Sequence, residues 1–328
     1  MRNFLRMTLV LIALIVYASA VQARTLRLFL IGNSFSDNAK TYLPQLSKEG
    51  GHDLTIGAAQ VAGCSLERHW KAAAASIANA DDPDGKLYGG KTLHQMMGNT
   101  KWDVVTIQQN SANSPNVETY QPYARDLYNY VKKLQPQAEV VFHQTWAYRT
   151  DAKSFGNPAT GSGRRAQSQH EMYAHSRAAY RQIAGDLGVR VIPNGDAFWN
   201  VDSDPIWGFK PDTSFDLSTA VEPALPNQKH SLHVGYRWQD GKLSGDFNHA
   251  AVSGKYLGGL VFYSFLFNES PEKLTFVPSG VDADFAAHLR TVAWKTVRAA
   301  SEDNTPSAGT VVVPAMRTPT DVLSKPAS

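Results

Sequence analysis

The sequence contains only one cysteine, Cys64, among its 328 residues. One cysteine cannot form a disulfide within the chain, and a zinc site built from several thiolates is also excluded. Charge is scarce as well, because charged residues make up 19% of the chain and the formal net charge is only +3. So small an excess of basic residues argues against a nucleic-acid partner. The 43% of hydrophobic residues must therefore stabilise the fold through a buried core.

Hydrophobic runs long enough to span a membrane are also lacking. The strongest candidate is Met7 to Ala18, which follows Arg2 and Arg6 and precedes the small-residue sequence Val21-Gln22-Ala23. This pattern is typical of a secretory signal peptide. We expect an exported mature protein, periplasmic or secreted, without integral membrane association; the alternative is an uncleaved N-terminal anchor.

The chain divides into three parts: a signal peptide at 1–23, a domain at 24–300 and a tail at 301–328. The tail is rich in Pro, Thr, Ser and Ala, which predicts disorder. Within the domain, apolar runs predict five strands, at 26–31, 53–56, 103–107, 138–142 and 189–192. Helical patterns predict helices at 39–48, 92–97, 120–134, 166–187, 250–267 and 283–300. Alternating strands and helices indicate an α/β domain with a parallel sheet covered on both faces. Residues 200–245, rich in Pro, Asp, Gly and Trp, are expected to form an ordered loop.

Ligands of open parallel sheets bind beyond the carboxyl ends of the strands, and polar residues follow three of the predicted strands. These groups, with a fourth far downstream, are Gly32-Asn33-Ser34, Ala62-Gly63-Cys64-Ser65, Gln108-Gln109-Asn110-Ser111 and Asp246-Phe247-Asn248-His249. Together they offer a hydroxyl nucleophile, hydrogen-bond donors and an Asp–His pair. Acyl transfer requires these parts, since serine needs an adjacent base and the developing oxyanion needs donors.

These four blocks resemble those of the SGNH hydrolases, also called the GDSL esterase/lipase family. The first block resembles Gly-Asp-Ser-Leu, with Asn33 in place of Asp, and the last matches Asp-x-x-His fully. The third keeps Asn110 but lacks the family's glycine and aspartate, which is typical of an uncharacterised branch. The resemblance implies a flavodoxin-like, three-layer α/β/α fold with a central parallel sheet of about five strands.

The resemblance also implies roles for individual residues. Ser34 is the nucleophile, His249 the base and Asp246 its orienting acid. The oxyanion hole consists of the N–H groups of Ser34 and Gly63 with the side-chain amide of Asn110. Because a side-chain amide is all that the chemistry requires, the amides of the two preceding residues, Gln108 and Gln109, stay open as alternatives.

Structural roles are possible for the same residues. Ser34 could be a helix N-cap, although Ser36 and Asp37 could cap as well. His249 is expected at the start of a helix, where the macrodipole would lower its pKa and keep it neutral. Gly63 could serve a turn that needs positive φ.

Several aromatic residues raise the question of substrate contacts. They could line a substrate site or belong to the core, and the candidates are Trp146, Tyr148, Trp207 and Trp238. No cofactor or metal site is expected. The predicted function is an exported serine esterase acting on small acyl esters, acetyl esters of carbohydrate being favoured. The alternatives are an O-acyltransferase for an exported polysaccharide and a non-catalytic glycan-binding module.

Overall fold

The computed structural model describes residues 23–303. Residues 1–22 and 304–328, which hold nearly all of the expected signal peptide and tail, lie outside the described residues. The last helix ends at Asp303, slightly beyond the predicted domain end at 300. In the described part of the chain, no helix combines the length and apolar character needed to cross a membrane.

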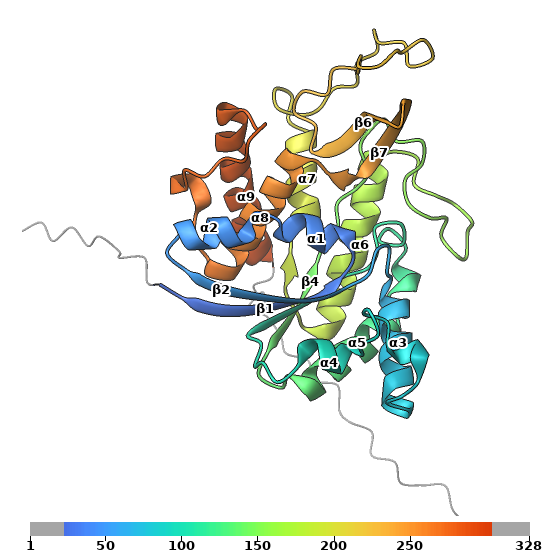
Figure 1. The fold of residues 1–328 in the computed structure, drawn as a ribbon, viewed down its shortest axis with the longest axis vertical. Helices are drawn as coiled ribbons and strands as arrows, with labels where there is room; N and C mark the ends of the chain where they lie inside the picture. Colours follow the sequence, from blue (N-terminus) through green and yellow to red (C-terminus); the bar gives the residue numbers. More distant parts are fainter. Residues whose placement is uncertain (1–22, 304–328) are drawn as a thin grey trace, which may run out of the picture.

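Five parallel strands form the central sheet (Figure 1), in the order β2-β1-β3-β4-β5. They are β1 (Thr25–Gly32), β2 (Asp53–Gln60), β3 (Val104–Ile107), β4 (Glu139–His143) and β5 (Val191–Ile192). This is the flavodoxin-like order, so the predicted fold is confirmed. Neighbouring strands share their direction, and their carboxyl ends therefore meet at one edge of the sheet.

Helices cover both faces of the sheet, because the strands are apolar on both sides. Leu28 and Leu30 of β1 face one core, and Phe29 and Ile31 face the other. The first core is covered by α1 (Ser34–Lys40), α2 (Leu43–Glu49), α7 (Asn194–Asp202), α8 (Val252–Phe267) and α9 (Ala283–Asp303). The second is covered by α3 (Leu66–Ala78), α4 (Leu93–Met97), α5 (Tyr123–Leu134) and α6 (Gln169–Leu187). Three short 3₁₀ helices complete the connections, at Pro83–Gly85, Val117–Thr119 and Pro271–Lys273.

Helix α8 lies at the centre of the first core and is buried along most of its length. It approaches α1 closely at Gly258, where a Cβ would lie 2.9 Å from the Cα of Ala39. Glycine is thus required at this contact. The close packing brings α1, which begins with Ser34, against the helix that follows His249.

Some predicted elements differ from the structure. The helix expected at 39–48 is two helices, because the chain turns after Lys40 and α2 begins with Leu43-Pro44. Helix α3 was not predicted. The segment 200–245 is not only a loop, since it includes β6 (His233–Gln239) and the start of β7 (Lys242–Ala250), which pair as an antiparallel hairpin. Asp240 and Gly241 form its turn with positive φ angles of 51° and 69°, and Asp-Gly is a strong hairpin signal in a sequence.

Candidate active site

Ser34, His249 and Asp246 form one continuous hydrogen-bonded chain. The Nε2 atom of His249 lies 2.9 Å from the Oγ of Ser34. The Nδ1 atom of His249 lies 3.0 and 3.1 Å from the two carboxylate oxygens of Asp246. The His249 side chain is 37% exposed, so the site opens to solvent. The three residues that the sequence singles out are therefore in contact, although 215 positions separate Ser34 from His249.

Ser34 is the first residue of α1 and is not its N-cap. The cap is Asn33, whose Oδ1 accepts a hydrogen bond of 3.0 Å from the N–H of Phe35. The hydroxyl of Ser34 is therefore free to contact His249. Since the first N–H groups of a helix have no intrahelical partner, the N–H of Ser34 is also available to a ligand.

The sequence predicts His249 at the start of a helix, but the residue is located on strand β7. Helix α8 begins only at Val252, so the argument from the helix macrodipole does not apply. The β6–β7 register contains a bulge, because Asp246 pairs with Gly235 while Ala250 pairs with His233. Four steps along β7 thus match two along β6. The extra residues curl the strand and bring the Asp246 and His249 side chains to the same side.

Asp246 is held as a carboxylate by hydrogen bonds within this bulge. Burial alone raises the pKa of Asp246, but the N–H groups of His249 and Asn248 and the charge of His249 outweigh it, so that the pKa lies below its usual value. The His249 N–H contributes a bond of 3.1 Å. The anion can therefore orient the imidazole and stabilise its protonated form.

The chain segment after β4 stabilises the bulge through hydrogen bonds to its backbone carbonyls. The indole N–H of Trp146 donates to the carbonyl of Asn248 at 2.9 Å, and the N–H of Arg149 donates to the carbonyl of Phe247 at 2.8 Å. Trp146 is fully buried and stacks between Phe35 and Phe198. The sequence left open whether Trp146 lines a substrate site or belongs to the core. It belongs to the core, where it holds the backbone beside His249 in place.

A buried polar chain runs under the site from α7 to the β2 end of the sheet. Asn194 donates to the Nε2 of His143 at 2.9 Å, and the Nδ1–H of His143 donates to the Oε1 of Gln108 at 2.8 Å. The amide of Gln108 donates to the Oδ1 of Asn33 at 2.8 Å, and Asn33 donates to the carbonyl of Cys64 at 3.0 Å. Burial lowers the pKa of His143 to about 3, so it is neutral and can accept at Nε2.

The loop after β2 supplies the second expected donor. Gly63 has a φ of +64°, and among residues 23–303 its N–H donates to no other protein group. The side chain of Asn110 donates to the carbonyl of Gly63 at 3.0 Å, while its Oδ1 accepts from the N–H of Asn113 at 2.9 Å. An amide nitrogen carries two hydrogens, so Asn110 keeps one donor for a ligand.

The two alternative amides are already engaged. Gln108 is buried in the chain to Asn33. Gln109 is fully buried, donates to Thr119 and accepts from the N–H of Leu66. Neither glutamine offers a hydrogen-bond donor at the surface. Of the three candidate amides, only that of Asn110 is therefore available to a ligand at the carboxyl ends of the strands.

The remaining aromatic candidates lie in different surroundings. Tyr148 lines a pocket beside the bulge. Trp207 stacks on Phe285 and His288 and packs against the first core. Trp238 of β6 donates to the carbonyl of Ala224 at 2.9 Å, so it anchors the loop that precedes the hairpin.

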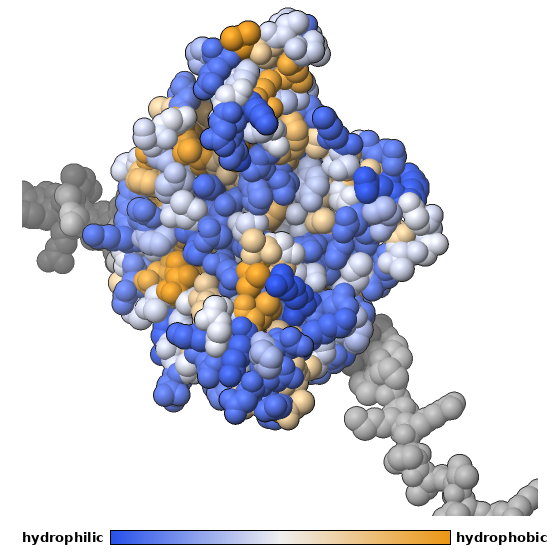
Figure 2. Space-filling view, turned by 45° about the vertical axis from the view of Figure 1, so that its right-hand side comes forward, coloured by the Kyte–Doolittle hydropathy of each residue, from blue (hydrophilic) through white to orange (hydrophobic). Residues whose placement is uncertain are grey.

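The pocket that Tyr148 lines has a volume of about 620 Å³, and its wall contains Phe247 and Asn248, the two residues that precede His249. The loop between α7 and β6, which projects at the top of Figure 1, contributes Leu217. This loop exposes Leu217, Val221 and Leu225, and Figure 2 shows hydrophobic surface on the projection.

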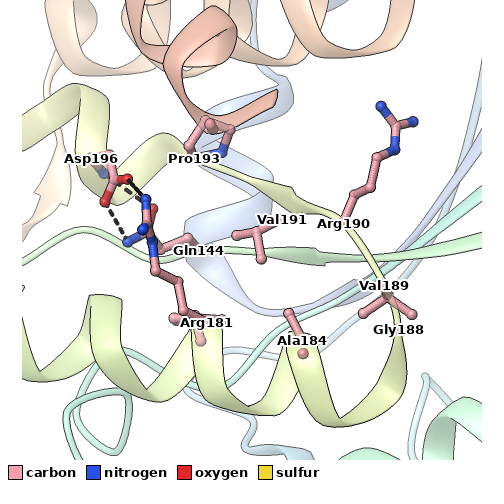
Figure 3. A pocket seen from close by; sticks show the side chains of 12 residues that line it. Gln144, Arg181, Ala184, Gly188, Val189, Arg190, Val191, Pro193 and Asp196 are labelled. Atoms are coloured by element: carbon pink, nitrogen blue, oxygen red, sulfur yellow. Dashed lines mark hydrogen bonds and ion pairs between the residues drawn. The ribbon is translucent and has the colours of Figure 1, made fainter. Parts of the chain in front are cut away.

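A second pocket, of about 590 Å³, lies at the β5 edge between α6 and α7 (Figure 3). Its carboxylate, Asp196, accepts a hydrogen bond of 2.8 Å from Gln144 and contacts Arg181 at 3.8 Å. No residue of its wall belongs to the four sequence blocks, so it is not part of the candidate site.

Cys64 is buried beside Gly63, and burial raises the pKa of its thiol to about 11. Such a thiol is a poor nucleophile.

Within residues 23–303, no group of three or more His, Cys, Asp or Glu side chains is arranged to hold a metal ion.

Comparison with known proteins places this chain in a family. Residues 27–207, more than half of the chain, match the model described as "Domain of unknown function (DUF4886)". The chain belongs to the DUF4886 family. A crystal structure of a DUF4886 family protein from Bacteroides uniformis is 24% identical with a TM-score of 0.63, and the match covers 84% of this chain and 95% of that one. No curated protein matches the sequence.

Structures named for SGNH hydrolases also match this DUF4886 protein. One, described as "a putative SGNH hydrolase from Slackia heliotrinireducens", is 19% identical with a TM-score of 0.42, and the match covers 74% of this chain and 99% of that chain. The sheet order confirms the fold that the resemblance to the SGNH hydrolases implied, and the family match fits an uncharacterised branch.

Proposed function

We propose that this protein is an exported serine esterase that hydrolyses small acyl esters. The observation that carries the proposal is the chain from the Ser34 hydroxyl through the His249 imidazole to the Asp246 carboxylate. In the proposed reaction, the Ser34 Oγ attacks the ester carbonyl while the Nε2 of His249 takes its proton. His249 then returns this proton to the leaving alcohol.

The oxyanion of the tetrahedral intermediate needs preorganised donors. In this proposal they are the N–H groups of Ser34 and Gly63 and the free hydrogen of the Asn110 amide. The hydrogen bond from Asn33 to the Cys64 carbonyl ties the two backbone donors together. Water, activated by the same imidazole, then releases the acid from the acyl-enzyme. Favoured substrates are acetyl esters, with carbohydrate as the alcohol.

Hydrolysis of para-nitrophenyl acetate and octanoate by the protein without residues 1–23 tests this proposal. Ser34→Ala and His249→Ala should each lower kcat by roughly a thousandfold or more, since each removes a reacting group. Ser214→Ala, at an exposed serine in the projecting loop, is the matched control and should keep full activity. A serine-directed fluorophosphonate should label the unmodified protein and fail to label Ser34→Ala. Unchanged activity in Ser34→Ala would refute the serine mechanism.

A further inference from the structure

The pocket beside the bulge is in position to hold the alcohol part of the ester. On one side its wall contains Phe247 and Asn248, which directly precede His249. On the other side it contains Tyr148, whose hydroxyl lies 3.2 Å from the Oγ of Ser111, the residue after Asn110. The pocket wall thus includes the residues that precede the proposed base and a tyrosine that contacts the neighbour of the proposed oxyanion donor.

Ring-shaped groups suit the walls of this pocket. Tyr236 and Phe247 pack edge to face, with ring centroids 5.0 Å apart, and Tyr148, Leu217 and Leu243 add further apolar surface. Aromatic faces pack against the apolar faces of sugar rings, and the asparagine and hydroxyl groups nearby can bond to polar substituents. At about 620 Å³ the pocket is far larger than an acetyl group needs.

The pocket continues into a neighbouring depression of about 560 Å³ through Ala152, Lys153 and Ser154, which line both. The joined walls include three cationic residues, Lys153, Arg164 and Arg165, and contain neither aspartate nor glutamate. Positive charge that is only partly balanced by acid favours an anionic ligand.

Two of these cations lack a full set of partners. Lys153 makes no ion pair with any residue in 23–303. The Nε of Arg165 is buried and has no hydrogen-bond acceptor. Arg164 differs, because it pairs with Glu171 of α6. Neither Lys153 nor Arg165 is balanced by a carboxylate within residues 23–303, so an anionic group in the depression would meet positive charge from both.

We propose that this joined pocket binds a sugar ring that carries a negative charge, so that the substrate is an acyl ester of an anionic glycan. The inference rests on the proposed esterase function and adds the class of alcohol. Tyr236 and Phe247 contact the ring, and Lys153 and Arg165 face its charged substituent.

Binding to the Ser34→Ala variant tests the pocket without depending on turnover. Calorimetry at low ionic strength would compare a galacturonate trisaccharide with the uncharged galactose trisaccharide of the same linkage, and a glucose 6-phosphate arm would distinguish phosphate from carboxylate recognition. We expect tighter binding of a charged sugar. Adding Lys153→Glu should weaken that binding about tenfold and leave the uncharged sugar unaffected. Lys101→Glu, at an exposed lysine between α4 and β3, is the matched control.

Equal affinity for the charged and uncharged sugars would overturn the proposal, as would an absence of binding or a charged sugar that binds Lys153→Glu unchanged. The esterase proposal is judged separately by the para-nitrophenyl esters. Loss of one result with retention of the other would therefore show which of the two proposals is wrong.

Discussion

At the scale of the residue, Asn33 shows why a change in a motif can be tolerated. Its Oδ1 accepts from Phe35 and Gln108, and its amide nitrogen donates to the carbonyl of Cys64. An aspartate could accept both bonds but could not donate. Asparagine at 33 and glutamine at 108 therefore fit each other, whereas the sequence shows only two separate departures from the SGNH pattern.

Asn33→Asp should consequently lower both activity and stability. A carboxylate would face the carbonyl of Cys64 inside the protein, and loss of this buried bond costs on the order of 1–3 kcal/mol. We expect kcat for para-nitrophenyl acetate to fall at least about tenfold, because the backbone donors at Ser34 and Gly63 would separate. Urea unfolding and steady-state kinetics measure the two effects. Asn227→Asp, where the exposed side chain only accepts a bond from Lys229, is the control. An Asn33→Asp protein with normal kcat would contradict this account of the polar chain.

The candidate site was predicted from the sequence because its reactive residues follow strands or form a complete local motif. Ser34 and Gly63 come after β1 and β2, and Asp246 and His249 are three positions apart. The supporting contacts could not be predicted in this way. His143 and Trp146 reach the site from β4 and the segment after it, and nothing in their local sequence indicates Gln108 or Asn248 as partners.

At the scale of the element, the β6–β7 hairpin positions His249, the proposed base, and Arg149 stabilises the hairpin. The guanidinium is buried, makes two bonds of 2.7 and 2.8 Å to Asp151, and lies over the rings of Phe209 and Phe247. It also bonds to Gln228 at 2.8 Å, which in turn accepts from the N–H of Tyr236 in β6.

Arg149→Lys should reduce activity through the position of His249. Lysine keeps the charge but cannot make the paired bonds to Asp151 and reach Gln228 as well. We expect kcat to fall about tenfold or more while the far-ultraviolet circular dichroism stays unchanged. Arg190→Lys is a matched control, since Arg190 also makes paired bonds to a carboxylate, Glu139, and lies over a ring, Phe265, at the opposite sheet edge. If both variants lose activity equally, the hairpin has no special role.

Most strands of the sheet were predictable because they contain runs of apolar residues, whereas β2 is mixed in character and only residues 53–56 of it were expected. The hairpin was missed because its residues are half exposed and mixed in character, although Asp240-Gly241 gave a local turn signal. Helix α3 was missed despite a sequence signal, since Ser65 caps it and accepts from the N–H of Arg68. The bulge in β7 depends on pairing with β6, so it has no counterpart in the local sequence.

At the scale of the whole molecule, buried histidines should make stability depend on pH. Burial lowers the pKa of His69 and His233 to about 4 and that of His143 to about 3. Below about pH 6.5 these histidines bind protons in the unfolded chain but stay neutral in the folded protein. Stability contributed by these groups is therefore present above pH 6.5 and is lost as the pH falls. Asp202 acts in the opposite direction, because burial raises its pKa to about 7.

Because three histidines lower stability as the pH falls and only Asp202 raises it, we expect the free energy of unfolding to decrease between pH 6.5 and 4. Urea unfolding across this range would measure it, with a slope of at most about 1.4 kcal/mol per pH unit for each proton. Asp202→Asn removes the opposing group and should make the decrease steeper. His94→Gln, at an exposed histidine of α4, should leave the slope as it is. A flat or rising profile would show that the buried histidines do not control acid stability.

The distance of 215 positions between Ser34 and His249 affects how activity arises during folding. Residues 27–207, which match the family, contain Ser34, Gly63 and Asn110 but neither Asp246 nor His249. While the chain is synthesised from its N-terminus, the serine and its donors emerge well before the imidazole that would activate the serine. A nascent or truncated chain would hold an inert hydroxyl, and turnover would begin only once the C-terminal third had docked. Esterase activity would thus serve as a sensitive reporter of completed folding.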